Sequence, residues 1–207
     1  MKTPRALVPV VIGLLILGGW EWFVRSGRVD DLFVPAPTQI GAWFWSALCD
    51  GSLVSVTWVT MRRLMLGFAI GAAIGIPIGA LCARSSLARD TIGILSLGMQ
   101  TLPSVCWVPV AIIAFDQTEA AVLFVVVMGT VWAVVIAVQE SVLNVQPLYL
   151  RAAQTMGSRG WHLWTQVIFP AALPGIISGL KQGWAFAWRS LMAAEIFVVI
   201  IDGFGLG

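Results

Sequence analysis

The hydrophobic pattern divides the chain into five long apolar stretches, separated by polar or proline-containing segments. A helix needs roughly 20 apolar residues to cross the hydrocarbon core of a bilayer. The five stretches that approach this length cover residues 6–24, 64–83, 91–115, 120–138 and 183–201. The pattern therefore predicts an all-α, polytopic membrane helical bundle with five visible spans, the first of which we expect to be retained rather than cleaved.

Two longer polar regions interrupt this pattern. The first region covers residues 29–53. Its Pro35 and Pro37 exclude a regular helix around residues 35–37. A Trp-bearing amphipathic segment follows at 38–50, and we expect it on the membrane surface. Residues 139–174 are amphiphilic and predict two short helices, over 148–156 and from Gly160 until Pro170 halts it. We accordingly expect an N-terminal transmembrane helix (1–28), an extracytoplasmic segment (29–53) and a core domain (54–207).

Composition supports a membrane protein. Of the 207 residues, 59% are hydrophobic and 11% are charged, and the mean hydropathy is +0.92. A soluble domain carries about 25% charged residues. Eleven Trp against one Tyr also fit, because Trp favours the headgroup zone. The net charge of +2 gives no reason to expect a nucleic-acid partner.

The distribution of basic residues predicts that the N-terminus is cytoplasmic. Lys and Arg concentrate in cytoplasmic loops. With the N-terminus inside, the inner segments hold Lys2, Arg5, Arg84, Arg89, Arg151, Arg159 and Lys181, and the outer segments hold Arg25, Arg28, Arg62 and Arg63. Residues 139–174 then form a cytoplasmic loop. Residues 202–207 resemble a turn into another helix, so we expect a sixth span that is absent from this chain.

A glycine stripe marks the second span. Four glycines at steps of four residues share one helix face: Gly67, Gly71, Gly75 and Gly79. Such a face lets another helix approach closely. We interpret the stripe as helix packing, with the lining of a solute path as the alternative.

Two charges and two prolines fall inside predicted spans. A charge near the bilayer centre costs at least ~2.5–3.5 kcal/mol, so Arg189 and Glu195 must face protein or a watery cavity. They lie on opposite sides of one helix and cannot simply pair with each other. Either they line a solute path, where Arg189 attracts an anion, or they form structural ion pairs. Pro103 and Pro109 interrupt the third span, as kinks or as part of a binding site.

The predicted helix over residues 148–156 has the composition of a docking surface. Small Ala152 and Ala153 lie beside bulky Leu148, Tyr149 and Met156. A partner can approach the backbone at the small residues and bury the large ones.

The spacing of this loop resembles a known family pattern: Glu-Ala-Ala, three residues, Gly, nine residues, Ile, one residue, Leu-Pro. The pattern marks the cytoplasmic loop of type I ATP-binding-cassette importer permeases, in which a coupling helix sits in a groove of the ATPase subunit. The corresponding stretch here includes Arg151, Ala152, Ala153, Met156, Gly157, Trp161, Val167 and Pro170. Arg151 stands where the family usually has Glu.

Further motifs are similar to the nitrate, sulfonate, taurine and bicarbonate branch of this family, at residues 33–37, 63–68, 75–79, 102–109 and 193–195. The resemblance implies six spans, two permease copies or paralogues around one path in the cell inner membrane, ATPase subunits at the coupling loop, and an extracytoplasmic binding protein that delivers a small anion. The chain has no GxxxxGK[ST] phosphate loop, so ATP and Mg are expected on the ATPase and no cofactor on this chain.

Two other classes of membrane protein were weighed. A membrane-embedded enzyme would need clustered catalytic side chains, and none are evident in the sequence, so we expect no catalytic residues. His162 is the single histidine, and Cys49, Cys82 and Cys106 have no CxxC spacing, so we expect no metal site. An ion-coupled secondary transporter of a small solute would do without a docking loop and stays the alternative.

Overall fold

A computed structural model of the chain describes residues 7–27 and 34–198. These residues form helices, and none of them forms a strand, so the predicted all-α fold is confirmed. The chain separates into two compact units, residues 1–55 and residues 56–207.

The first unit contains α1 (Leu7–Arg25) and α2 (Pro37–Cys49). Pro37 is the first residue of α2, where its missing N–H costs no helical hydrogen bond. Glu21 joins the two helices, because its carboxylate accepts hydrogen bonds from the backbone and hydroxyl of Thr38 at 3.2 and 2.8 Å. The helix expected at residues 38–50 is thus present, and its position on the membrane surface stays a prediction.

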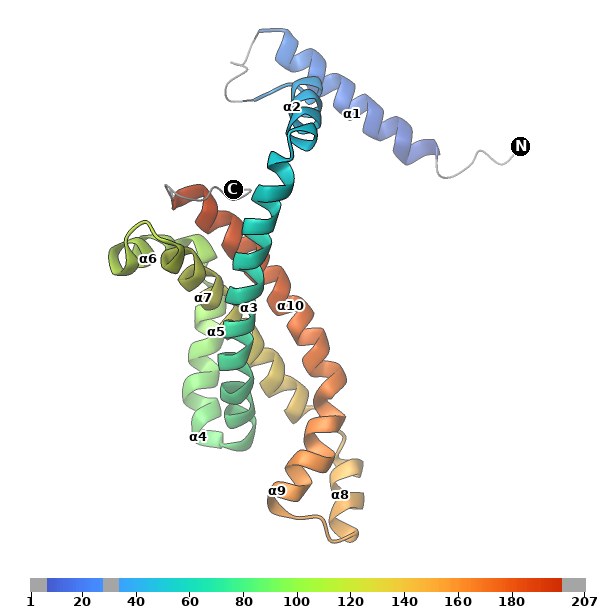
Figure 1. The fold of residues 1–207 in the computed structure, drawn as a ribbon. Coiled ribbons are helices and arrows are strands. Elements are labelled where there is room, and N and C mark those ends of the chain that lie inside the picture. Colours follow the sequence, from blue (N-terminus) through green and yellow to red (C-terminus); the bar gives the residue numbers. More distant parts are fainter. Residues whose placement is uncertain (1–6, 28–33, 199–207) are drawn as a thin grey trace, which may run out of the picture. The chain divides into compact units, whose positions relative to one another are not determined.

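The second unit is built around α7 (Figure 1). Its first helix is α3 (Ser52–Arg84), whose first residues belong to the first unit. In chain order the remaining elements are α4 (Ser86–Ala88), the π-helix η1 (Arg89–Gly93), α5 (Ile94–Thr101), the 3₁₀-helix η2 (Ser104–Cys106), α6 (Trp107–Phe115), α7 (Glu119–Leu143), α8 (Pro147–Thr155), α9 (Gly160–Leu163), the π-helix η3 (Trp164–Ile168) and α10 (Phe169–Phe197).

The helices that can span a membrane agree with the predicted spans in number. Four stretches are long and apolar enough: Val8–Arg25, Ser52–Arg84, Glu119–Leu143 and Gly160–Phe197. A fifth consists of Ser86–Thr101 and Ser104–Phe115, bent by 98° at the break between them. The chain therefore has four straight candidates and one broken one among the described residues.

Proline effects were predicted only in part. The helix breaks at Pro103, and the preceding Leu102 is extended with ψ of 130°. Pro109, by contrast, interrupts nothing, because it is the third residue of α6, where backbone N–H groups have no partner within the helix. The prediction that Pro109 breaks the third span is wrong.

Pro170 does not halt the second loop helix as predicted. Helix α9 continues through η3 into α10, so the last span begins at Gly160 rather than near residue 183. Pro170 is the second residue of α10. The π-helical turn immediately before it shifts the hydrogen-bond register by one residue, which accommodates the missing proline N–H. The second span also starts earlier than residue 64, at Ser52, because α3 continues through Arg62 and Arg63.

Glycines bring two helices close to α7. A Cβ atom added at any glycine of the stripe on α3 would lie 2.6–2.8 Å from an atom of α7, against Val126, Thr130, Val134 and Val135 in turn. A second stripe on α10, which was not predicted from the sequence, also lies against α7. Its members, Gly175, Gly179 and Gly183, face Ser141, Ala137 and Val134. The glycine faces of α3 and α10 therefore both pack closely on α7.

We expect Gly79→Ala to destabilise the chain by about 1–3 kcal/mol, the usual range for overpacking. The added Cβ would lie 2.6 Å from the backbone oxygen of Val135, which cannot move without shifting α7. Gly98→Ala on α5 is the matched control, because a Cβ there meets nothing within 4 Å. The control should be neutral or up to ~1 kcal/mol more stable. Unfolding of the two variants in detergent compares them, and equal stability would contradict the close contact.

Candidate functional site

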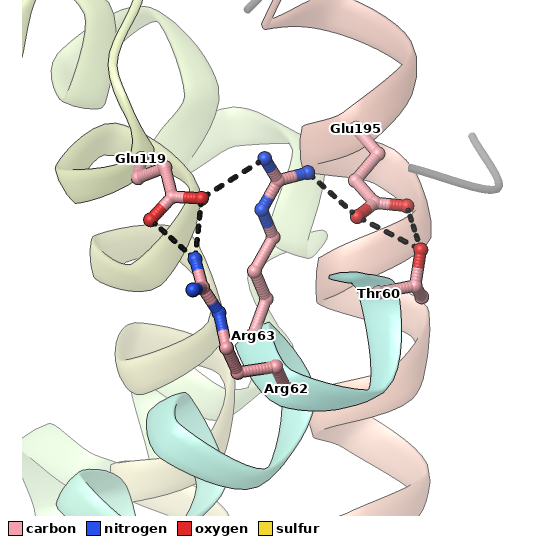
Figure 2. A network of polar contacts seen from close by, with 5 residues as sticks. All are labelled: Thr60, Arg62, Arg63, Glu119 and Glu195. Carbon is pink, nitrogen blue, oxygen red and sulfur yellow. Dashed lines mark hydrogen bonds and ion pairs between the residues drawn. The ribbon is translucent and has the colours of Figure 1, made fainter. Parts of the chain in front are cut away.

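A buried ion-pair network joins three helices of the second unit (Figure 2). The Arg63 side chain on α3 is 2% exposed; its Nη1 lies 3.1 Å from Oε1 of Glu195, and its Nη2 lies 3.3 Å from Oε1 of Glu119. Thr60 donates its hydroxyl to both carboxylate oxygens of Glu195 at 3.1 and 3.0 Å. Arg62 binds Glu119 at 2.8 Å on the more exposed side. The network fastens α3 to the start of α7 and to α10.

The structure therefore places Glu195 in an inter-helix ion pair, one of the two roles that the sequence left open. Its side chain is 1% exposed, so it is enclosed by protein. A buried pair of this kind is costly to break, because removal of one partner leaves the other charge uncompensated. Arg63 was not predicted as its partner, although a charge inside the apolar α3 was the available signal.

Arg189 lies apart from this network, beside a cavity at the broken span. The cavity, of about 320 Å³, opens where α5 ends and η2 begins, and Pro103 borders it. The Arg189 guanidinium lies 5.1 Å from the centre of the Phe186 ring, and the residue is exposed. Trp132 on α7 also lines the cavity, and its indole Nε1 is buried without a hydrogen-bond partner among the described residues.

A larger polar cavity of about 690 Å³ lies between α5, α7 and α10. Gln100 on α5 borders both cavities, so they follow one another along α7. Tyr149 and Gln146 border the larger cavity at its α8 end. Most of its polar lining consists of uncharged side chains, with Glu140 as the one acidic group among the described residues: Gln100, Glu140, Ser141, Asn144, Gln146, Tyr149, Ser178 and Gln182. This arrangement suits the passage of a hydrated solute.

The loop helices lie at the end of the unit opposite the C-terminal end of α10 (Figure 1). Helix α8 is one residue displaced from its prediction. Ala153 is buried against the unit, and Ala152 is exposed. The large apolar side chains around it are open to their surroundings: Leu148 is 67% exposed, Met156 81% and Trp161 73%.

Glycine is required at two positions of the turn between α8 and α9. Gly157 has φ of +89° and Gly160 has φ of +58°, in the left-handed region that other residues rarely adopt. The Ser158 N–H bonds the Ala153 carbonyl at 2.9 Å and ends α8. The structure thus gathers most loop residues at one tip: Arg151, Ala152, Ala153, Met156, Gly157 and Trp161. Pro170 lies further along, in the first turn of α10.

Comparison with known proteins gives this arrangement a family. Residues 75–202 match the model of the binding-protein-dependent transport system inner membrane component, and they include α4–α10 and both cavities. The chain belongs to this family. It is therefore a multi-pass inner-membrane permease component of a transport system that depends on a binding protein.

Individual relatives cover nearly the whole chain. The bicarbonate transport system permease protein CmpB of Synechococcus elongatus is 31% identical over 99% of this chain and 76% of its own length. The nitrate import permease protein NrtB of Synechocystis sp. is 26% identical over 99% of this chain and 76% of its own. A probable ABC transporter permease protein of Brucella melitensis is 28% identical over 87% of this chain and 72% of its own.

No three His, Cys, Asp or Glu residues of the described ranges are grouped so that they could hold a metal ion. In the second unit, the ion pairs among the described residues are those between the arginines and carboxylates of the network in Figure 2. The candidate site thus consists of two cavities and the exposed tip at α8, with ion pairs that hold the helices together.

Arg63→Met should lower the stability of the chain by about 3–5 kcal/mol, because it leaves the Glu195 carboxylate buried without its cation. Arg62→Met is the matched control one residue earlier, in an ion pair whose side chains are 52% and 44% exposed. It should cost at most about 1 kcal/mol.

The double variant Arg63→Met, Glu195→Gln removes both buried charges and should recover part of the loss. Unfolding in detergent is compared for the wild type, Arg63→Met, Glu195→Gln and the double variant. The four free energies of unfolding form a double-mutant cycle, which isolates the interaction energy between the two residues. Additive losses would show that the two charges do not interact.

Proposed function

We propose that the chain is the transmembrane permease subunit of an ATP-driven importer and forms the path for a small anion of the nitrate or bicarbonate type. The observation that carries the ATP-driven part is the exposed tip at α8, which a secondary transporter would not need. Two observations support an anion as the transported solute. The relatives CmpB and NrtB are named for bicarbonate and nitrate, and the cavity at the broken span has Arg189 on its wall.

The tip at α8 docks on an ATPase subunit in this proposal. Ala152 lets the partner approach the helix backbone, while Leu148 and Met156 supply large anchors. Motion of the ATPase reaches the membrane because the tip is packed on the unit. Leu150 of α8 and Leu163 of α9 pack against a buried cluster that includes Val142 of α7, Ile168 of η3 and Ala172 of α10.

The remaining parts of the transporter follow from this docking. ATP and Mg bind to the ATPase subunit, and this chain needs no cofactor of its own. The tip and the N-terminus face the cytoplasm, and a solute-binding protein delivers the anion on the opposite side. A second permease, a copy of this chain or a paralogue, closes the path against the exposed face of the cavities.

ATP-dependent uptake tests the proposal. The chain is reconstituted in vesicles with the ATPase and binding protein of its operon, and uptake of nitrate and of bicarbonate is followed. We expect uptake that requires ATP hydrolysis and stops when the phosphate-loop lysine of the ATPase is replaced. Uptake that follows an ion gradient without ATP would instead identify a secondary transporter.

Ala152→Trp should abolish most co-purification with the ATPase, because it fills the exposed small-residue surface of α8. Gln154→Trp is the matched control on the same helix; it lies two residues on, about 200° around the axis. Both residues are exposed, so neither change should unfold the permease.

We expect the control to retain the ATPase. A Trp at residue 152 that leaves co-purification intact would contradict docking on this face. Loss of the ATPase from both variants would contradict a contact confined to the Ala152 face of α8.

A further inference from the structure

The cavity at the broken span lies about halfway along α7. Its α7 lining, Met128, Gly129 and Trp132, comes from the middle of a 25-residue helix. At 1.5 Å per residue, Gly129 lies about 15 Å from the start of α7. Gly129 also packs on Ser190, the neighbour of Arg189. Arg189 therefore stands near the middle of the membrane, where a cation needs a compensating group or water.

No carboxylate compensates Arg189 among the described residues that line this cavity. Of the acids on α7 and α10, Glu119 and Glu195 are bound by Arg62 and Arg63, and Glu140 lines the larger cavity instead. The recorded contact of the Arg189 guanidinium is the face of Phe186. Such a contact leaves the edge of the guanidinium, with its N–H donors, able to bind a ligand.

A second donor points to a ligand independently. The Nε1–H of Trp132 is buried and has no partner in the described chain. A buried donor without an acceptor costs free energy, and most buried polar groups in proteins are satisfied. Gln100, Thr101 and Ser104 add an amide and two hydroxyls to the same wall. The cavity thus offers one positive charge and several donors.

From these groups we infer that Arg189 and Trp132 form an oxyanion-binding site within the permease, halfway along the path, a site that rests on the proposed function. The ligand is a small anion with several acceptor oxygens, which Arg189 binds through paired N–H donors and Trp132 binds through its indole N–H. The volume of about 320 Å³ admits such an anion together with water. Gln100 borders the larger cavity as well and leads the anion onward toward the α8 end.

The site has a consequence for selectivity. Arg189 is the one cation among the described residues that line either cavity. The permease itself therefore selects negative charge at mid-membrane, in addition to any selection by the binding protein. An uncharged solute would leave Arg189 uncompensated at this depth.

Binding can be measured without the ATPase. The full chain, with ¹⁵N-labelled Trp indoles, is placed in nanodiscs and titrated with nitrate, bicarbonate and methanesulfonate against chloride at constant ionic strength. The Trp132 signal is assigned from Trp132→Phe. We expect a saturable shift of that signal with at least one of these anions. The shift should be lost in Arg189→Gln and kept in Lys181→Gln, an exposed cation on the same helix. No saturable shift with any of the three, or an unchanged shift in Arg189→Gln, overturns the site.

Uptake by the assembled importer gives the second readout. Arg189→Gln should reduce the uptake rate at least about tenfold, and Trp132→Phe about tenfold, the loss expected for one hydrogen bond to a charged group. Both variants should keep the ATPase. Trp184→Phe is the matched control for the indole, because Trp184 packs edge-on against Phe68 away from the cavity.

The two readouts separate the site from the proposed function. Wild-type vesicles without ATP-dependent uptake would overturn the proposed function, even if the Trp132 signal still shifts with anions. ATP-dependent uptake that is equal in wild type and Arg189→Gln would overturn the site and leave the importer standing.

Discussion

The close packing of α3 and α10 on α7 is the constraint on which the second unit depends. In lipid, helices gain little from burying apolar side chains against one another, so association relies on tight contact and polar pairs. Glycines at four-residue steps on both flanking helices provide the contact. This approach brings Arg63 within 3.1 Å of Glu195, and the ion pair then holds α3 and α10 together near the start of α7.

The same packing separates the unit into a closely packed side and an open side. The glycine faces fill the space between α7 and its two close neighbours, whereas the broken span of α5 and α6 leaves two cavities against α7. Polar side chains therefore gather on the open side, with Arg189 at its middle. At one end the larger cavity reaches Tyr149 on α8, so this cavity and the exposed tip share a structural element.

Much of the fold could be predicted from the sequence. The length of the apolar stretches predicts the membrane spans, and local residue spacing predicts the α3 glycine stripe and helix α8 of the tip. Proline was harder to predict: Pro103 breaks a helix, Pro109 lies in a first turn that tolerates it, and Pro170 follows a π-helical turn inside a continuous helical stretch. The pairing of Arg63 with Glu195 joins residues 132 apart, and local patterns carry no such information. The unsatisfied indole of Trp132 likewise emerges only when its surroundings are known.

The most direct measurement of the central claim is the distance between the tip and an ATPase subunit. Met156→Cys, in a chain whose three natural cysteines are replaced by serine, is treated with a short bifunctional crosslinker in vesicles that contain the operon's ATPase. The account predicts a permease–ATPase product from residue 156 and none from a cysteine at Ser26, in the first unit. An intact complex that yields no product at residue 156 would contradict the claim that this tip couples the permease to ATP.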